Sequence, residues 1–429
     1  MTQTKKTNTC HIHIFSDDLA GLESGEGETR MIASALIKLS SMLQIAFGTA
    51  GASIIASNLD NSSQEQAIQP IVPGRRMMGI FGFCDVRNFT NATECLQEDI
   101  MVYINCIAEY AHTAVSDNGG FPNKNVGDAF LMAWPLTEGA WTSQTLGVKT
   151  SVQESAESAL RALLRVILET SCSHILRRMS SNPELQKRIP GFRTELGFGL
   201  HIGWAIEGAI GSAEKVDPSY LSPDVEMSMK LEAATKHYGV SILLTNNFYD
   251  VLPHNIQQLC RCIDRVQEPG SRTPVDLYTY DFNSFSVQSG KMPTVLGKPE
   301  KSFWDQFPPS TSANFRATFA TAMRHYTNGY WNSAKEFLDM CLLEEPKDLA
   351  TQRLIEVLAH HDFEAPANWK GFREVSGNSF GPYDPDEKSF QTASFRKTSV
   401  AASLASENSQ DTPKRVTSRA AFGYSQELR

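Results

Sequence analysis

The sequence predicts a mixed fold of strands and helices, α/β or α+β, for residues 71–285. The first observation is a series of apolar, strand-like runs: MMGIFGF, AFLMAW, ELGFGLHIG, AIEGAIG, SILLT and DLYTYDF. The second is that long helical patterns alternate with them, such as ATECLQEDIMVYINCIAEYAHTAVSDNG and VEMSMKLEAATKHYG, which ends at Gly239 as a C-cap would. Strands alternating with helices indicate a layered domain with one large core.

Changes in composition and residue pattern divide the rest of the 429 residues into five segments. Residues 1–29 are polar and predict disorder, and residues 30–70 predict an amphipathic helix for dimerisation or signalling, followed by a linker. A Pro/Gly/Ser connector at 286–311 leads to residues 312–373, where two amphipathic helices resemble one tetratricopeptide unit packed on the domain. The Ser/Thr-rich tail at 374–429 predicts disorder.

Charge and cysteine usage exclude several classes of protein. The formal net charge of −9 argues against nucleic acid as a partner, because binding phosphate backbones needs clustered Lys and Arg. The uncharged stretch 39–57 is diluted by Ser, Thr, Gln and Gly, so no membrane span is predicted. Eight scattered cysteines without C-x-x-C spacing, and no signal-peptide pattern, predict a cytoplasmic location, with or without attachment to a membrane through a partner.

Two aspartates stand at the ends of apolar strand-like runs. Asp85 follows the run IFGF and precedes a small turn, NFT, while Asp128 follows Gly127 and starts the run AFLMAW. Either aspartate alone is best explained as a turn or cap residue. Together they suggest a divalent-metal site, provided that the strands are neighbours, because Mg²⁺ prefers carboxylates and substrate phosphates. The turn after Asp85 and the helix starting near Asn91 would direct N–H groups at the same anion.

Four segments in this order resemble the catalytic domain of class III nucleotidyl cyclases: FCDVRNFT, NKNVGDAF, LGFGLHIGWAIEGAIGS and SYLSPDVEMSMKLEAATKHYGVSILLT. The resemblance covers roughly residues 73–285, and the flanking helix and the NWKGFR stretch resemble the flanks of a subgroup of these cyclases. It implies a ferredoxin-like α+β fold with a long helical insertion. It also implies a dimer, formed by two identical chains or with a related cyclase chain, which converts a nucleoside triphosphate to the 3′,5′-cyclic monophosphate and pyrophosphate at its interface.

The resemblance assigns roles to the residues around the first aspartate. Asp85 and Asp128 match the metal-binding aspartates, with the Val86 carbonyl as a further ligand, and imply two Mg²⁺ or Mn²⁺ ions per site. One ion would lower the pKa of the ribose 3′-hydroxyl, and the other would hold the triphosphate for in-line attack. Phe89 and Thr90 lie in the turn whose amides would face the phosphates.

Lys124 matches the position that reads the purine in the opposite site of the dimer, and Ser219 matches the second base-reading position. A lysine there donates to adenine N1, whereas guanylyl cyclases usually place glutamate, so ATP is favoured over GTP. A serine hydroxyl fits the exocyclic amine of adenine but discriminates modestly. Outside the family context, Lys124 would be a solvated hairpin lysine and Ser219 a residue of a surface turn.

The helix that stabilises the transition state departs from the family pattern. Where the family reads approximately V-N-x-A-x-R-L-E, this chain reads VEMSMKLE, which puts Glu226 at the asparagine position and Lys230 at the arginine position. A further family lysine falls on Pro269, with Arg272 as the nearest substitute. Losing one donor to the transition state typically costs about 10²–10³-fold in rate.

Two hypotheses from different classes follow. The chain is the metal-donating half of an adenylyl cyclase, completed by a partner that brings the asparagine and arginine, or it is an inactive cyclase-like subunit that regulates by dimerising. A polymerase-type palm with two aspartates is a third possibility, which the acidic net charge disfavours. His201, within an apolar run, is interpreted as a core residue without a role in the reaction.

Overall fold

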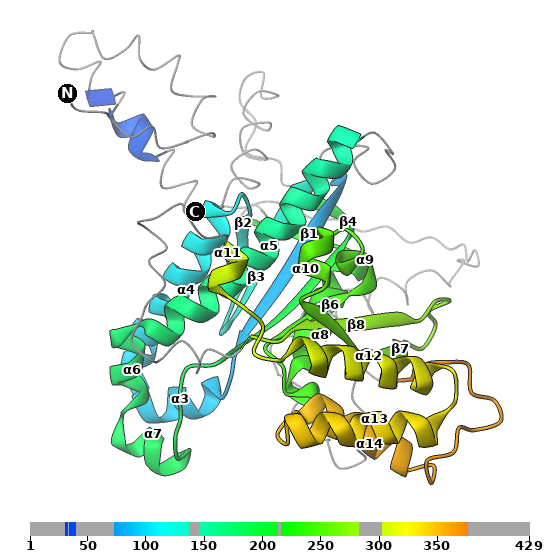
Figure 1. Cartoon of the computed structure of the whole chain (residues 1–429). Coiled ribbons are helices and arrows are strands. Elements are labelled where there is room, and N and C mark those ends of the chain that lie inside the picture. The colour runs from blue at the N-terminus through cyan, green and yellow to red at the C-terminus, as the bar shows by residue number, and fades with distance from the viewer. Residues whose placement is uncertain are drawn as a thin grey trace, which may run out of the picture. The chain divides into compact units, whose positions relative to one another are not determined.

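A computed structural model of the chain describes residues 31–32, 34–39, 73–136, 146–212, 216–282 and 303–375 (Figure 1). Residues 31–32 and 34–39 are helical, in agreement with the start of the predicted amphipathic helix. The predictions for residues 1–29, for most of 30–70, for most of the connector and for the tail beyond residue 375 lie outside the described residues.

Strands within the described residues form one mixed sheet in the order β2-β3-β1-β4-β6-β8-β7-β9, with β5 paired to β4 off this path. Their bounds are β1 Arg75–Val86, β2 Phe121–Val126, β3 Ala129–Leu136, β4 Leu196–Gly211, β5 Val216–Leu221, β6 Ile242–Thr245, β7 Cys260–Gln267, β8 Val275–Tyr280 and β9 Arg373–Glu374.

The following helices lie between β1 and β9 along the chain. Their bounds are α3 Phe89–Leu96, the 3₁₀ turn η1 Gln97–Asp99, α4 Ile100–Asp117, α5 Leu146–Cys172, α6 His174–Ser180, α7 Pro183–Arg188, α8 Pro223–Tyr238, α9 Asn246–Tyr249, α10 His254–Gln257, α11 Phe303–Gln306, α12 Ala313–Thr327, α13 Trp331–Glu344 and α14 Leu349–Ala359.

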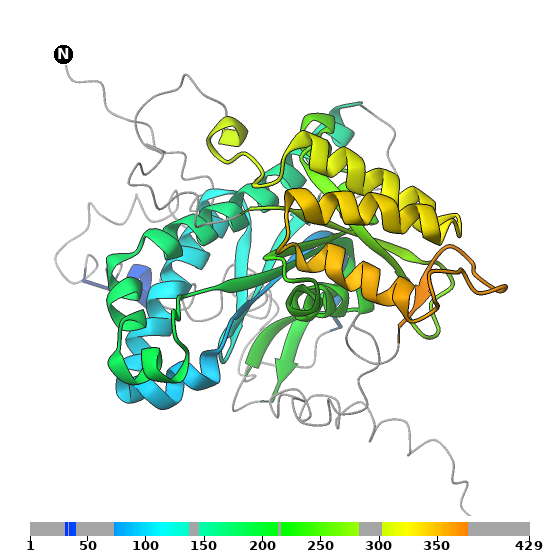
Figure 2. The same ribbon diagram turned by 60° about the horizontal axis from the view of Figure 1, so that its bottom comes forward.

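The first four strands have the ferredoxin-like topology that the resemblance implied. Along the chain the elements run β1, α3 and α4, β2, β3, α5 and β4, and across the sheet the strands lie in the antiparallel order β2-β3-β1-β4. The long helical insertion consists of α5, α6 and α7 between β3 and β4. In both Figure 1 and Figure 2, α4 and α5 lie side by side, apart from α12, α13 and α14.

The central strand β1 is buried on both faces, which explains its nearly continuous apolar sequence. Because successive side chains point to opposite faces, Ile80 and Cys84 enter the main core together with apolar residues of α4 and α5. Phe81 enters a smaller cluster on the other face with Tyr220 and with Val225 of α8. The strand is thereby held between two helical layers, and its C-terminal end is fixed in position.

The helices α12, α13 and α14 pack on the sheet through a second core. Leu231 and Ala234 of α8 and Ile263 of β7 share this core with aromatic residues of α12 and α13, among them Phe315 and Trp331. The structure describes three helices here where the sequence predicted two, because the chain turns between α12 and α13. The likeness of this region to a tetratricopeptide unit stays a prediction.

Three local predictions differ from the structure. The helix expected over ATECL…SDNG is broken into α3, η1 and α4, because Gln97, at the end of α3, has a φ of 50° that a right-handed α-helix does not accommodate. The two runs ELGFGLHIG and AIEGAIG form one long strand, β4. Strands β2, β5, β7 and β9 were not predicted. β2 and β5 are polar and each contains a proline, Pro122 and Pro218, β7 has charged residues at three of its eight positions, and β9 has two residues.

Candidate active site

The structure brings Asp85 and Asp128 together at one end of two paired strands. Asp85 is the penultimate residue of β1 and lies opposite Ala129, the first residue of β3. Asp128 directly precedes Ala129, in a tight turn in which Gly127 adopts a φ of 65°. Burial, and then the negative charge of Asp85, raise the pKa of Asp128. The condition that the two strands are neighbours is therefore fulfilled.

A network of charges that was not predicted from the sequence surrounds Asp85. The Lys236 ammonium lies 3.0 Å from Oδ2 of Asp85, and Nη1 of Arg87 lies 3.8 Å from the same oxygen. Arg87 also donates to Glu232 at 2.5 Å and to the hydroxyl of Thr235. Burial raises the pKa of Glu232, although Arg87 opposes this effect. Helix α8 thus supplies both a carboxylate and a cation to the aspartate pair.

The aspartate pair fits a divalent ion that keeps positions open for substrate. Two close carboxylates of like charge repel each other, and a hard cation relieves this repulsion while satisfying their oxygens. Among the described residues no group of three or more His, Cys, Asp or Glu side chains could hold a metal ion. Because Mg²⁺ is often bound by one or two carboxylates together with phosphates and water, two aspartates are a sufficient protein contribution.

The turn after Asp85 leads directly into α3. Val86 is buried, and Asn88, with a φ of 56°, forms the N-cap of the helix. Phe89 packs against the main core and Thr90 is exposed in the first turn. The N–H groups at the start of a helix have no acceptor within it, so those of Phe89 and Thr90 suit an anion next to the aspartates.

Lys124 and Ser219, the predicted purine-reading residues, lie on strands β2 and β5. Asp217 connects them: its carboxylate is 3.8 Å from the Lys124 ammonium, and its carbonyl accepts a hydrogen bond from the Ser219 hydroxyl at 3.4 Å. Asp217 and Ser219 are two positions apart, so both side chains are on one face of β5. Asp217 was not predicted from the sequence, although the alternation of side chains along a strand VDPSYL would have placed it on the same face as Ser219.

The altered positions of the transition-state helix lie on one face of α8. Glu226 is exposed and Lys230, one helical turn later, is half-buried. The Lys230 ammonium forms an ion pair of 2.9 Å with Glu268, the residue that precedes Pro269. The lysine at the family arginine position therefore has its charge neutralised within the chain. Arg272 is exposed in the turn between β7 and β8.

The start of α8 is fixed to the sheet by a second polar network. Ser222 caps the helix, and Asp224 accepts a hydrogen bond of 2.8 Å from the backbone N–H of Trp204. His201 lies 3.4 Å from Asp224 through Nε2 and 2.8 Å from the Thr245 hydroxyl through Nδ1. Burial by itself would raise the pKa of Asp224, but the hydrogen bonds from His201 and from the Trp204 N–H outweigh it, so the pKa is lowered. His201 is a buried, hydrogen-bonded residue, in agreement with its interpretation from the sequence.

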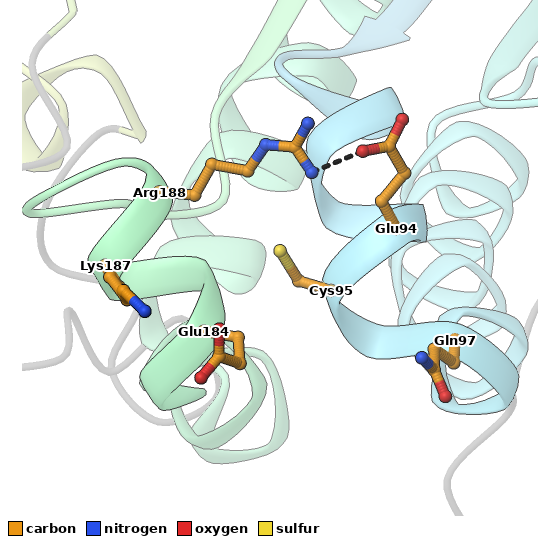
Figure 3. Close-up of a pocket in the computed structure, with 6 residues that line it drawn as sticks. All are labelled: Glu94, Cys95, Gln97, Glu184, Lys187 and Arg188. Atoms are coloured by element: carbon orange, nitrogen blue, oxygen red, sulfur yellow. Dashed lines mark hydrogen bonds and ion pairs between the residues drawn. The ribbon is translucent and has the colours of Figure 1, made fainter.

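A surface pocket between α3 and α7 lies at the other end of α3 from the aspartates (Figure 3). Figure 3 shows Arg188 of α7 reaching across to Glu94 of α3, with which it forms an ion pair, and the thiol of Cys95 beside them. Glu184 and Lys187 complete a lining in which acidic and basic groups balance. The pocket has neither the carboxylate pair nor a net charge for a nucleotide.

Comparisons with known proteins agree with the motif resemblance. The chain is 27% identical over 201 residues to the Dictyostelium discoideum protein named "Adenylate cyclase, terminal-differentiation specific", a match that covers 46% of this chain and 8% of that protein. It is 23% identical over 272 residues to an adenylate cyclase of Anabaena cylindrica, covering 60% of this chain and 49% of that protein. The chain thus spans less than half of the curated relatives that it matches. These relatives support a class III cyclase domain in this chain.

Similar solved structures carry cyclase names as well. A bacterial light-regulated adenylyl cyclase matches with 21% identity and a TM-score of 0.42, over 60% of this chain and 66% of that one. The adenylyl cyclase CyaB from P. aeruginosa matches with 19% identity and a TM-score of 0.34, over 48% and 95% of the two chains.

Two further observations concern the N-terminal part of the chain and the membrane. The family described as "RasGEFs all helical domain" matches residues 4–60. No helix within the described ranges is long and apolar enough to cross a membrane. The stretch 39–57, for which no span was predicted, lies outside those ranges except for Leu39.

Proposed function

We propose that this chain is a nucleotidyl cyclase domain that converts ATP to 3′,5′-cyclic AMP and pyrophosphate at a dimer interface, and that it donates the metal-binding aspartates. The observation that carries the proposal is the convergence of Asp85 and Asp128 at the same end of two paired strands. The names of the adenylate cyclase relatives support the same class of reaction. Class III cyclase motifs surround both aspartates.

The chain's own residues divide the work between metal, phosphate and base. Asp85, Asp128 and the carbonyl of Val86 would hold Mg²⁺ or Mn²⁺, which when bound supplies Lewis-acid activation of the ribose hydroxyl and neutralises phosphate charge. The first turn of α3 directs backbone N–H groups at the triphosphate. In the opposite site of the dimer, Lys124 would donate to the adenine ring and Ser219 would accept from its exocyclic amine, which favours ATP there.

The residues of this chain at the transition-state positions, Glu226 and Lys230, are poorly suited to stabilise the transition state. Glu226 places a negative charge where the family has an amide, and Lys230 is neutralised by Glu268 at 2.9 Å. Lysine also lacks the planar fork with which arginine binds phosphate oxygens. In a homodimer both sites would contain these residues. In a heterodimer, a related chain with asparagine and arginine would complete one site around Asp85 and Asp128, so we infer that a heterodimer is the active form.

A second candidate function is a cyclase-like subunit that binds a partner without turnover. The pairing of Lys230 with Glu268 favours it, because the cation of the transition-state helix is already satisfied inside the chain. Under this alternative the aspartates bind metal and nucleotide, and dimerisation regulates the partner.

Cyclic AMP production by the purified chain with Mn²⁺ and ATP separates these functions. The proposal predicts weak turnover by the chain alone and a large increase when a related chain that carries the asparagine and arginine is added. Asp85→Asn and Asp128→Asn should each abolish this increase. Asp339→Asn removes the same charge from an exposed ion pair of α13 and serves as the matched control. If the nucleotide binds but no related chain restores turnover, the regulatory function is correct and the enzymatic one is wrong.

A further inference from the structure

Lys236 occupies an unusual position for a lysine. Its ammonium contacts Oδ2 of Asp85 at 3.0 Å, although the two residues are 151 positions apart in the sequence. The Asp85 side chain is 17% exposed, whereas the Lys236 side chain is 56% exposed. The ammonium therefore approaches the carboxylate from the solvent side, the side from which an ion would enter.

The surrounding charges show why this contact matters. Three carboxylates, Asp85, Asp128 and Glu232, lie within electrostatic reach of two cations, Arg87 and Lys236. One negative charge remains, so the metal-free cluster is nearly neutral. Without Lys236, only Arg87 would offset the repulsion between the two aspartates. Arg87 is already paired with Glu232.

The two cations differ in how easily they can move. Arg87 is 13% exposed and is fixed by the Glu232 carboxylate at 2.5 Å and by the Thr235 hydroxyl. Lys236 has a flexible side chain, and among the described residues its ion-pair partner is Asp85. An ion pair with one exposed partner is weak, so displacing the Lys236 ammonium into water is easy. Displacing Arg87 would leave the buried Glu232 without its cation.

We propose that Lys236 is a built-in counter-ion that occupies the entry side of Asp85 in the metal-free chain and is displaced when a divalent cation binds. This inference rests on the proposed function of the aspartate pair. A dication and an ammonium at the same carboxylate oxygen repel each other, so Lys236 has to leave, and its departure weakens metal binding. The residue thus sets the concentration of divalent metal that the chain needs, and holds the aspartates in place until the metal arrives.

Titration of the full chain with Mn²⁺ alone, followed by electron paramagnetic resonance of the free ion, tests this directly. Lys236→Gln should bind Mn²⁺ roughly 3- to 10-fold more tightly than the native chain, since both the competing pair and the repulsion are removed. Lys236→Arg keeps the charge and should stay within about twofold of the native affinity. Lys335→Gln removes the same charge from the remote pair with Asp339 and should leave the affinity unchanged.

Asp85→Asn distinguishes failure of this inference from failure of the proposed function. If Asp85→Asn weakens Mn²⁺ binding but Lys236→Gln leaves it unchanged, the counter-ion role is wrong and the metal site stands. If Asp85→Asn has no effect on Mn²⁺ binding, both are wrong. Thermal unfolding gives a second reading: adding Mn²⁺ should raise the melting temperature of Lys236→Gln more than that of the native chain.

Discussion

Replacing Arg261 with methionine should strongly destabilise the chain, because this residue joins the sheet to the C-terminal helices. Arg261 lies in β7 with 1% of its side chain exposed. It donates to Asp281 at 2.6 and 3.0 Å and to Asp348, the N-cap of α14, at 3.0 and 2.6 Å. Its guanidinium also lies 5.1 and 4.8 Å from the ring centroids of Phe315 and Phe319 of α12.

The magnitude follows from what the substitution leaves behind. Asp281 and Asp348 are 8% and 13% exposed, so losing Arg261 leaves two nearly buried carboxylates without a cation. Breaking a buried pair from one side typically costs about 3–5 kcal/mol. At about 2–4 °C per kcal/mol for a domain of this size, the melting temperature should fall by roughly 10 °C.

The effect should also depend on pH in a defined direction. Burial alone would raise the pKa of Asp348, but Arg261 and Thr351 together lower it below 3.8. A carboxyl group whose pKa is lowered on folding contributes stability above its unfolded pKa and loses it as the pH falls through the folded one. Without Arg261 this contribution disappears, so the difference in stability between native chain and variant should be large at pH 7 and smaller below pH 3.8.

Urea unfolding followed by tryptophan fluorescence measures this difference, since Trp331 and Trp369 belong to the core of the C-terminal helices. The triple variant Arg261→Met, Asp281→Asn, Asp348→Asn removes all three charges and should recover much of the loss. A single Arg261→Met variant that unfolds within about 1 kcal/mol of the native chain would refute the reasoning. It would mean that the C-terminal helices are held by their apolar contacts alone.

Three further predictions concern the site and helix α8. Glu268→Gln releases the Lys230 ammonium and should lower the KM for ATP about 3- to 10-fold in a homodimer assay; an unchanged KM would mean that Lys230 does not face the nucleotide. Asp217→Asn loosens Lys124 and, in the same homodimer assay, should reduce the preference for ATP over GTP by a few fold; a preserved preference would remove Asp217 from the base site. Gly239→Ala strains the left-handed C-cap of α8, where φ is 65°, and should cost about 1–2 kcal/mol in urea unfolding; a neutral result would contradict the cap geometry.

The sequence predicted the elements whose residues repeat a simple pattern. The apolar run before Asp85 indicated a buried strand, and the apolar run after Asp128 indicated another, so both strand ends were placed correctly. Helix α8 and its end at Gly239 followed from helical spacing and a C-terminal glycine. These features depend on neighbours within a few residues, which a sequence displays directly.

Strands and contacts set by distant residues were beyond prediction. β2 and β5 are edge strands in which Pro122 and Pro218 are tolerated because one side of each strand has no neighbour to bond. The break at Gln97 requires a positive φ, which a glutamine side chain does not signal. The pairing of Lys236 with Asp85, and that of Lys230 with Glu268, depends on tertiary packing of α8 and has no local pattern.

The most direct test of the central claim is an anomalous difference map from crystals of the full chain grown with Mn²⁺ and a non-reactive ATP analogue. A metal site formed by the aspartate pair predicts a manganese peak about 2.0–2.6 Å from carboxylate oxygens of both Asp85 and Asp128, with Lys236 turned away. Manganese bound elsewhere, or nucleotide bound with no manganese peak at these two side chains, would contradict it.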